Sequence, residues 1–280
     1  MSRWPRAASL ALLVGALGLR HAVAAEPSAD ARRSGFAYMT PSTQAMQRDD
    51  TQNPGMLWVG DGEASWRRKA GKADQACADC HGAASASMRG VATRSPDFDL
   101  RLERPVNLAA RINLCRERHQ QAEPLPLESQ ELLNLEVFVA FQSRGMPIAP
   151  ATDERLASFR ERGKQLYRQR MGQLDLACTQ CHDDSAGKRL GSSVIPQAHP
   201  TGYPIYRLEW QSLGSLQRRL RGCLTGIRAE PFAYDALKLV DLELYLKSRA
   251  TRASVGDTGG AALRSGSVLA CGDCGCMPES

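Results

Sequence analysis

The pattern Cys-x-x-Cys-His occurs twice in this chain, and it constrains the fold more than any other feature of the sequence. The copies are Cys77-Ala-Asp-Cys80-His81 and Cys178-Thr-Gln-Cys181-His182. Two thiols at this spacing add to the vinyl groups of a porphyrin, and the imidazole that follows ligates the iron. A redox dithiol or a zinc site would account for the cysteines, but it would give no role to the histidine that follows them in both copies. The sequence therefore predicts two covalently bound haem c groups, with the four cysteines as attachment points and His81 and His182 as iron ligands.

The two motifs lie in an internal repeat. Gly62 and Trp66 stand 15 and 11 residues before the first motif, and Gly163 and Tyr167 stand at the same distances before the second. Residues four apart share one face of a helix. In cytochrome c domains such a glycine lies where the first and last helices cross, because the missing side chain lets the two backbones approach. We expect one such crossing in each copy.

Apolar stretches with helical periodicity follow both motifs, at 132–141 and 237–246, and would form the closing helices. The expected architecture is mainly α, with two cytochrome c-type domains in tandem between an N-terminal arm and a flexible C-terminal tail. The predicted arm, first domain, second domain and tail span 26–44, 45–150, 151–250 and 251–280. The arm is expected to pack on one domain or on a partner. Pro147 and Pro150 mark a short junction between the domains.

The predicted tail is rich in Gly and Ser, which favours flexibility. It also contains three cysteines, Cys271, Cys274 and Cys276. Cysteines at this spacing could bind a soft metal ion, but an extension without a selected function is the favoured interpretation.

The first 25 residues are typical of an export signal. Arg3 and Arg6 precede an apolar stretch at 7–19, and small residues at 23–25 resemble a cleavage site. The alternative is an uncleaved membrane anchor, but the stretch is shorter than the ~20 residues that a span needs, and no later apolar run approaches that length. We therefore expect a signal peptide at 1–25 and a mature protein in the periplasm, where disulfides persist.

The charge of the chain argues against a nucleic-acid partner. The formal net charge is +6, and removing the three arginines of the signal peptide, which contains no acidic residue, leaves +3. A charge this small and dispersed is unlike a nucleic-acid footprint. It leaves small anions and acidic proteins open as partners.

The iron of the second motif lacks a methionine partner of the kind common in electron-transfer cytochromes c. No Met occurs between the second motif and the end of the second closing helix. The candidates there are His199, Cys223 or an open position. Cys223 follows a cluster of arginines, Arg218, Arg219 and Arg221. Their positive charge favours the thiolate, the form that ligates metals and attacks electrophiles.

The first copy repeats the spacing of arginine and cysteine. Arg111 stands four residues before Cys115, and Arg219 stands four before Cys223. We interpret this as a repeated role in which the thiolate ligates the iron. Three other residues compete for the first iron: Met88, Met146 and His119. A Cys115–Cys223 disulfide is the structural alternative, because the compartment is oxidising.

Several blocks of sequence occur in an order that is characteristic of one family. They are Met46-Gln-Arg-Asp-Asp, Asn53-Pro-Gly-Met-Leu-Trp, Arg111-Ile-Asn-Leu-Cys115-Arg, Ser143-Arg-Gly-Met-Pro-Ile, Gly202-Tyr-Pro-Ile-Tyr-Arg-Leu-Glu-Trp and Arg221-Gly-Cys223. On these blocks, residues 40–250 resemble the SoxA family, the dihaem subunits of the SoxAX cytochrome, an L-cysteine S-thiosulfotransferase of bacterial sulfur oxidation. The end of the chain departs from the family pattern.

The resemblance implies roles for specific residues. Cys115 and Cys223 would be the axial ligands of the first and second irons. Cys223 would also be the active-site cysteine, able to carry an extra sulfur as a persulfide, and Arg219 would contact the substrate. The implied reaction joins thiosulfate oxidatively to a cysteine thiol of a carrier protein similar to SoxYZ. The implied heterodimer partner is a small cytochrome c similar to SoxX, which passes the electrons on.

The alternative function is a dihaem periplasmic electron-transfer cytochrome without substrate chemistry. Electron donors to oxidases generally use the higher potential that Met ligation gives, whereas a thiolate holds the potential low. The absence of Met after the second motif therefore favours the enzyme.

Overall fold

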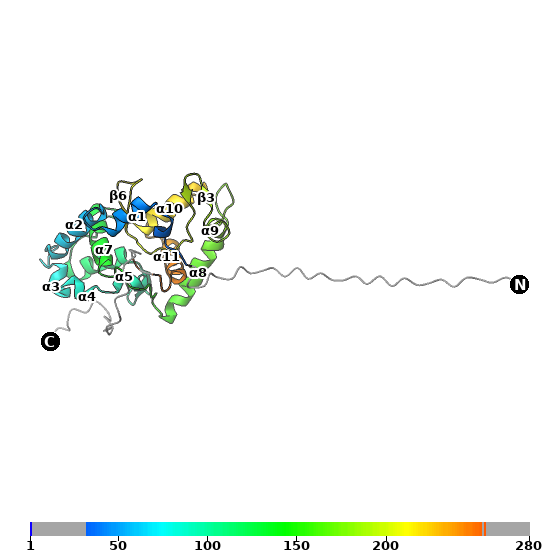
Figure 1. Cartoon of the computed structure of the whole chain (residues 1–280). Helices are drawn as coiled ribbons and strands as arrows, with labels where there is room; N and C mark the ends of the chain where they lie inside the picture. The colour runs from blue at the N-terminus through cyan, green and yellow to red at the C-terminus, as the bar shows by residue number, and fades with distance from the viewer. Residues whose placement is uncertain (2–31, 254, 256–280) are drawn as a thin grey trace.

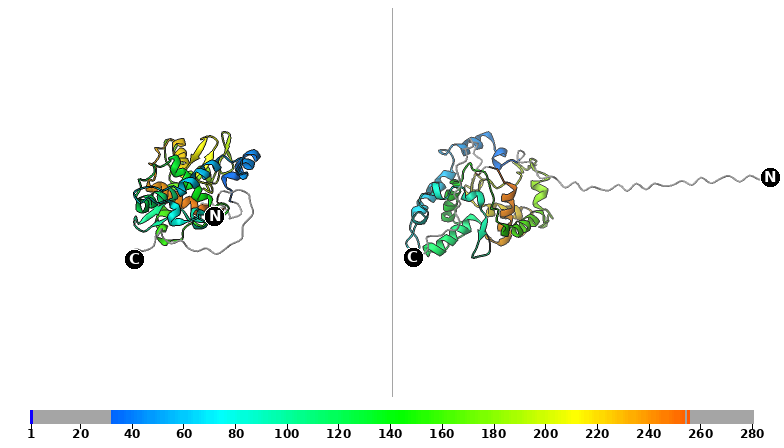
Figure 2. Two further views of the ribbon diagram at one scale, coloured as in Figure 1. Left: turned by 90° about the vertical axis from the view of Figure 1, so that its left-hand side faces the viewer. Right: turned by 90° about the horizontal axis from the view of Figure 1, so that it is seen from below.

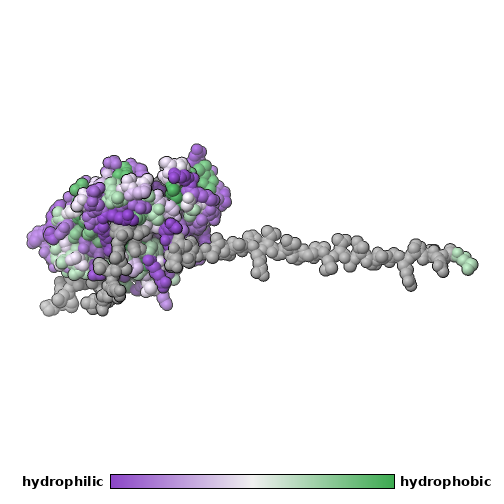
Figure 3. Space-filling view, in the orientation of Figure 1, coloured by the Kyte–Doolittle hydropathy of each residue, from purple (hydrophilic) through white to green (hydrophobic). Residues whose placement is uncertain are grey.

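A computed structural model gives the structure of the chain and describes Met1, residues 32–253 and Val255. The predicted signal peptide, apart from Met1, and the tail beyond Val255, with its three cysteines, lie outside the described residues. In the described part the chain is mainly helical, and its strands form two-stranded antiparallel sheets. None of the helices in this part is long and apolar enough to cross a membrane. On the face in Figure 3, hydrophilic residues predominate and hydrophobic ones form small separate patches.

Helices and hairpins follow one another in two similar series (Figure 1). The first series consists of η2 (Gly35–Tyr38), α1 (Pro41–Arg48), α2 (Gly55–Arg67), α3 (Cys77–His81), α4 (Ala84–Ser87), α5 (Val91–Arg94), β1 (Asp97–Asp99), β2 (Arg104–Val106), α6 (Leu108–Cys115), η3 (Arg116–Gln120) and α7 (Gln130–Phe141). The second consists of η4 (Glu154–Leu156), α8 (Ala157–Arg168), α9 (Cys178–His182), β3 (Arg189–Leu190), β4 (Ser193–Val194), β5 (Ile205–Arg207), β6 (Ser212–Gly214), α10 (Leu216–Gly226) and α11 (Leu237–Arg249). Both views in Figure 2 show α11, in orange, among other elements, in agreement with its burial.

Each series contains two long helices, one before its attachment motif and one at its end, that cross at a glycine. α2 packs on α7, and α8 packs on α11. A Cβ added to Gly62 would lie 2.1 Å from the Asn134 carbonyl oxygen, and one added to Gly163 would lie 2.0 Å from the Asp241 carbonyl oxygen. Both distances are far below van der Waals contact, so only glycine lets the backbones approach this closely. The predicted crossings and closing helices are confirmed in both series.

A hairpin followed by a capped helix also recurs. β1 and β2 lead into α6, which ends at Cys115, and β5 and β6 lead into α10, which contains Cys223. Asn107 and Ser215 begin these helices, and the side chain of each accepts a hydrogen bond from the backbone N–H three residues later. The matching positions are 108 residues apart, as 223 less 115 shows. The two candidate cysteine ligands therefore occupy the same place in the repeat.

The chain beyond α11 packs on the junction between the series. Backbone hydrogen bonds join residues 145–148 to Ala253 and Val255. Ile148 and Val255 are buried against Ala250. The described start of the predicted tail is therefore an ordered segment that holds the junction.

The described part of the predicted N-terminal arm contacts the second series. Arg32 donates a hydrogen bond to the Thr251 carbonyl oxygen, and the Arg33 backbone N–H donates to Gln197 Oε1 at 2.7 Å. These contacts attach the arm close to the residues that follow the second motif.

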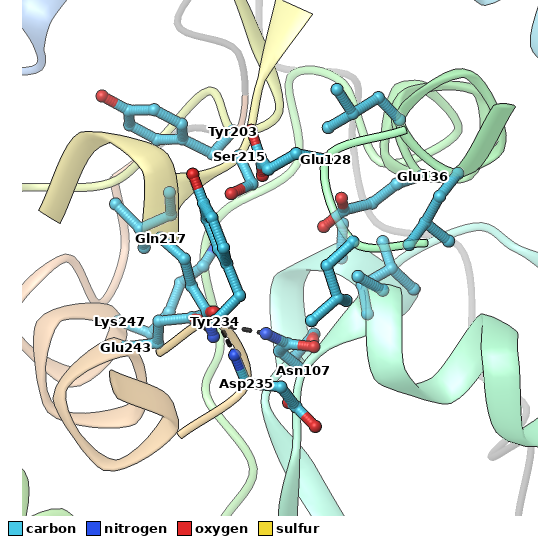
Figure 4. Close-up of a pocket in the computed structure, with 18 residues that line it drawn as sticks. Asn107, Glu128, Glu136, Tyr203, Ser215, Gln217, Tyr234, Asp235, Glu243 and Lys247 are labelled. Atoms are coloured by element: carbon cyan, nitrogen blue, oxygen red, sulfur yellow. Dashed lines mark hydrogen bonds between the residues drawn. The ribbon is translucent and has the colours of Figure 1, made fainter. Parts of the chain in front are cut away.

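A small polar pocket of about 50 Å³ lies between the two series (Figure 4). Glu136 of α7 and Glu243 and Lys247 of α11 line it. Glu243 accepts hydrogen bonds from Asn107 Nδ2 at 3.1 Å and Gln217 Nε2 at 2.7 Å. The side chain of Glu243, on α11, thus joins the N-cap of α6 in the first series to α10 in the second.

The ionisable groups of this pocket are strongly affected by burial. Burial raises the pKa of Glu136 to about 8, and the nearby Glu243 and Glu128 act in the same direction. Burial also raises the pKa of Glu243 to about 7 and lowers that of Lys247 to about 8. The charges of Glu136, Glu243 and Lys247 therefore change as the pH passes through the neutral range.

Candidate haem sites and catalytic site

Each Cys-x-x-Cys-His motif folds as a single helical turn, α3 or α9. The backbone N–H groups of Ala76 and Ala177 donate at 2.8 Å to Asp79 Oδ2 and Gln180 Oε1. A residue between the two cysteines thus caps the start of its own helix. Cysteines three apart on a helix lie on one face, so both thiols of a motif can reach one porphyrin.

A tight loop before each motif touches the segment that follows the candidate cysteine ligand. Gly71 and Gly172 have φ angles of 68° and 71°, a region that favours glycine. A Cβ on Gly71 would lie 2.0 Å from the Gln120 carbonyl oxygen, and one on Gly172 would lie 2.2 Å from the Ile227 carbonyl oxygen. These contacts fix α6 and α10 relative to the attachment motifs.

Partly buried apolar side chains surround both motifs. The first cluster includes Cys77, Ala78, Met88, Val91 and Ile112. The second includes Met171, Cys178, Ala198, Leu220 and Phe232. Ile112 and Leu220 each stand one helical turn before a candidate cysteine ligand, so these helices contribute to the apolar surroundings. Partly buried apolar side chains packed beside the first cysteine of each motif fit a covalently attached porphyrin in both series.

His182 is held in the form that ligates iron. Its Nδ1 donates to the Pro196 carbonyl oxygen at 2.7 Å, which leaves Nε2 for a metal. Burial lowers the pKa of its imidazole and favours the neutral ring. His81 instead packs against Trp66, with 5.6 Å between ring centroids. The two histidines therefore have different neighbours.

Cys223 lies beside the second motif. Burial raises the pKa of the Cys178 thiol to about 11, and the neighbouring Cys223 acts in the same direction. Arg219 stands one helical turn before Cys223 on α10. Burial lowers the pKa of His182, and the positive charge of Arg219 lowers it further. Burial raises the pKa of Tyr203, and the charge of Arg219 acts against that rise. The structure therefore brings Cys223 and Arg219 together with the second motif.

The arginines of α10 have different surroundings. The Arg218 guanidinium lies 4.4 Å from the ring centroid of Trp210, and Arg221 donates a hydrogen bond to the Phe232 carbonyl oxygen. Within the described residues the Arg219 guanidinium has no hydrogen bond or ion pair. The predicted cluster of three arginines thus provides one guanidinium that is free to bind an anion.

Arg111, at the matching position of the first series, is not free. It donates to Asp99 Oδ2 at 2.5 Å, and Arg118 donates to the same oxygen at 2.9 Å. The hydrogen bond from Arg118 holds the pKa of the Asp99 carboxyl well below its usual range. Arg111 acts in the same direction, whereas burial acts in the opposite one. The two arginines therefore have different partners, although the cysteines that they precede keep the same place in the repeat.

The alternative ligands are placed as follows in the two series. His199 is 8% exposed, and its Nδ1 bonds to the Arg33 carbonyl oxygen at 3.2 Å. Met88 packs in the cluster that contains Cys77, whereas His119 lies in η3. The arm thus binds one ring nitrogen of His199, a candidate ligand of the second iron. Met88, a candidate ligand of the first iron, lies near the first motif.

The structure contradicts the disulfide alternative. Neither Cys115 nor Cys223 forms a disulfide in the described part of the chain. Both thiols are partly exposed. They remain available as ligands.

Tyr203 and Arg207 were missed as site residues by sequence reasoning. Burial raises the pKa of Tyr203, and the nearby Cys223 acts in the same direction. Arg219 and Arg207 lower this pKa. Arg207 stands 108 residues after Asp99, so the repeat itself could have identified this position.

Comparisons with known proteins agree with these features. A family model described as the SoxA/TsdA cytochrome c domain matches residues 61–148. The SoxA subunits of L-cysteine S-thiosulfotransferase from Pseudaminobacter salicylatoxidans and Rhodovulum sulfidophilum are 36% and 35% identical to this chain. The alignments cover 79% and 81% of this chain and 78% and 79% of the relatives.

A solved structure also matches the fold. The crystal structure of SoxXA from P. pantotrophus includes a chain with a TM-score of 0.77 and 31% sequence identity. The match covers 80% of this chain and 85% of that one. The fold is therefore mainly helical and of the cytochrome c type, which implies covalently bound haem c, and the chain belongs to the SoxA family.

Proposed function

We propose that this chain is a dihaem subunit of an L-cysteine S-thiosulfotransferase, which joins thiosulfate to a cysteine thiol of a carrier protein. Its SoxA relatives carry that enzyme name. In this chain, the proposed function is supported by the surroundings of Cys223. Its thiol lies beside the second attachment motif, one helical turn from the free guanidinium of Arg219.

The reaction forms one sulfur–sulfur bond. Thiosulfate and a carrier thiol, R–SH, give R–S–S–SO₃⁻, one proton and two electrons. The S–H bond breaks and its proton leaves to solvent, while the new bond joins the carrier sulfur to the terminal sulfur of thiosulfate. Cytochrome acceptors take the two electrons.

Two covalent haems are proposed from the repeat. Haem c, when bound, supplies a one-electron acceptor. The residues that would hold the first are Cys77, Cys80, His81 and Cys115, and those for the second are Cys178, Cys181, His182 and Cys223. The first cysteine of each motif packs in an apolar cluster that includes residues of the crossing helices. These features support two tandem cytochrome c domains, at 45–150 and 151–250, of which the second is catalytic.

Cys223 and Arg219 are the proposed catalytic residues. Thiosulfate is a dianion, and a guanidinium can donate two parallel hydrogen bonds to its oxygens. Cys223 would bond to the terminal sulfur of thiosulfate, giving Cys–S–S–SO₃⁻, one proton and two electrons for the cytochrome acceptors. The carrier thiolate would then take the S–SO₃⁻ group and release the Cys223 thiolate. Its position one turn from Arg219 would place a docked anion next to the thiol.

The matched variants Arg219→Ala and Arg218→Gln test this function. Both remove one positive charge from α10, but Arg218 stacks on Trp210. We expect Arg219→Ala to raise KM for thiosulfate about tenfold or more with an unchanged haem spectrum. Arg218→Gln should leave KM near the parental value. A chain that exchanges electrons normally but never conjugates thiosulfate would instead support the electron-transfer alternative.

A small cytochrome c similar to SoxX is the proposed heterodimer partner, because the related solved structure is of SoxXA. A SoxYZ-like protein is the proposed carrier. The predicted signal peptide at 1–25 supports action in the periplasm.

A further inference from the structure

The second series has an arginine where the first has a buried acid. Asp99 is the last residue of β1, and Arg207 is the last residue of β5, the equivalent strand. In the first series Asp99 neutralises Arg111. In the second series the equivalent pair is Arg207 and Arg219, two cations. The first series therefore pairs an acid with its arginine, whereas the second has two arginines at the equivalent positions.

Arg207 and Arg219 act on the same groups. Both oppose the burial that raises the pKa of Tyr203, and both lie within electrostatic range of Glu209. Arg207 Nη2 donates to Glu209 Oε1 at 2.9 Å, but the Glu209 side chain is 64% exposed. An ion pair this exposed contributes little free energy, so replacing Glu209 by an incoming anion costs little. The two guanidiniums thus share one positively charged region next to Cys223.

Arg207 also keeps an unused donor. Its Nε is buried and has no hydrogen-bond partner within the described residues. Leaving a buried charged donor without an acceptor is unfavourable, and a bound anion would remove that penalty. Figure 4 shows Tyr203 at the edge of the pocket between the series, with its hydroxyl directed away from that pocket. The Tyr203 hydroxyl, whose pKa Arg207 and Arg219 both affect, therefore points out of that pocket.

We propose that Arg207 and Arg219 together form a subsite for the sulfonate end of thiosulfate beside Cys223. This inference rests on the proposed function. Two guanidiniums match a dianion in charge, whereas Arg219 alone would leave half of it uncompensated. Arg207 is then a substrate-binding residue that sets the preference for doubly charged oxyanions.

Three substitutions of Arg207 test the subsite in the holoprotein with its partner cytochrome and carrier. Arg207→Gln should raise KM for thiosulfate about tenfold with kcat nearly unchanged, and Arg207→Lys should restore part of the affinity. Arg207→Asp recreates the first-series pair, so its carboxylate should neutralise Arg219 and raise KM about a hundredfold. Arg170→Gln is the charge-matched control, because Arg170 pairs with Asp175 on the surface.

The outcomes separate this inference from the proposed function. An unchanged KM in Arg207→Gln, with an active parent protein, would overturn the subsite and leave the function intact. A parent protein that does not conjugate thiosulfate would overturn the function first. A fall in kcat and thermal midpoint without a selective rise in KM would show that Arg207 is only structural, and would also overturn the subsite.

Discussion

Arg249 donates a 2.6 Å hydrogen bond to Asp183, the residue directly after the proposed iron ligand His182. Tyr167 donates to the same carboxylate oxygen at 2.9 Å. The Arg249 side chain is 8% exposed, and its guanidinium lies 4.7 Å from the Tyr167 ring centroid. One carboxylate therefore joins α8, α9 and α11 at the second motif.

Asp183→Asn should destabilise the protein more than the loss of a surface ion pair does. Breaking a buried pair costs about 3–5 kcal/mol, and partial exposure of Asp183 reduces this to about 2–3 kcal/mol. Asp175→Asn, which removes the exposed pair with Arg170, should cost at most about 1 kcal/mol. Denaturant unfolding of the holoprotein measures both. Equal losses would contradict the structural role of Asp183.

Gly163→Ala should prevent the close crossing of α8 and α11. The new Cβ would lie 2.0 Å from the Asp241 carbonyl oxygen, so the helices must separate, at a cost of about 3 kcal/mol or more. Gly60→Ala is the control, since nothing lies within 4 Å of its Cβ position, and Ala there should stabilise α2 by up to about 1 kcal/mol. Similar thermal midpoints for the two variants would refute the crossing.

The crossings were predictable because they depend on local spacing. A glycine and an aromatic residue four apart, followed by an apolar helix, specify which faces meet. Gly62 and Gly163 could therefore be assigned from the sequence. The same holds for the attachment motifs, whose five residues form one helical turn.

The different roles of Arg111 and Arg219 could not be predicted in this way. Arg111 meets Asp99 through a hairpin whose strands have only three residues, too few for a periodic pattern. The polar pocket also escaped prediction, because Glu136 and Glu243 come from helices of different series. Polar residues on an amphipathic helix are normally expected to face solvent, and only the packing of the two series buries these.

The polar pocket predicts that Glu136→Gln stabilises the protein increasingly as pH rises from 5 to 7. Folding raises the pKa of Glu136 from 4.5 to about 8, so its favourable contribution is complete below 4.5 and is lost as pH rises toward 8. Gln cannot titrate and keeps the neutral form. At pH 7 we expect a gain of about 1–2 kcal/mol, a value reduced by partial exposure.

Unfolding curves of Glu136→Gln and its parent at pH 5, 6 and 7 measure this effect. Lys247 has a pKa lowered to about 8 and stays charged through most of this range, while Glu243 titrates in both proteins. Glu131→Gln, on the same helix but 44% exposed, is the control and should show a constant difference. A constant difference for Glu136→Gln as well would exclude the pocket as the origin of the pH dependence.

The mature protein should carry two covalent haems. Both motifs have two thiols on one face of a helical turn and an adjacent histidine. Mass spectrometry after acid–acetone extraction should therefore detect two haems in the parent and one in a Cys178→Ala, Cys181→Ala variant. Retention of only one haem by the parent would reject the dihaem proposal.

Cys223→Met separates the two roles proposed for Cys223, iron ligand and sulfur carrier. Met can ligate iron as a neutral thioether, so we expect a low-spin haem at a higher potential than that of the thiolate. Cys223→Ala should instead give a high-spin or water-ligated iron.

Neither variant should conjugate thiosulfate, because neither side chain can form a persulfide or act as a thiolate nucleophile. The electron-transfer alternative makes the opposite prediction for Cys223→Met, namely a competent cytochrome with no lost chemistry. Electron paramagnetic resonance and the conjugation assay on the same preparation decide between them. Activity near the parental level in Cys223→Met would reject Cys223 as the catalytic sulfur whatever its spectrum, whereas a low-spin but inactive protein would show that ligation alone does not account for this cysteine.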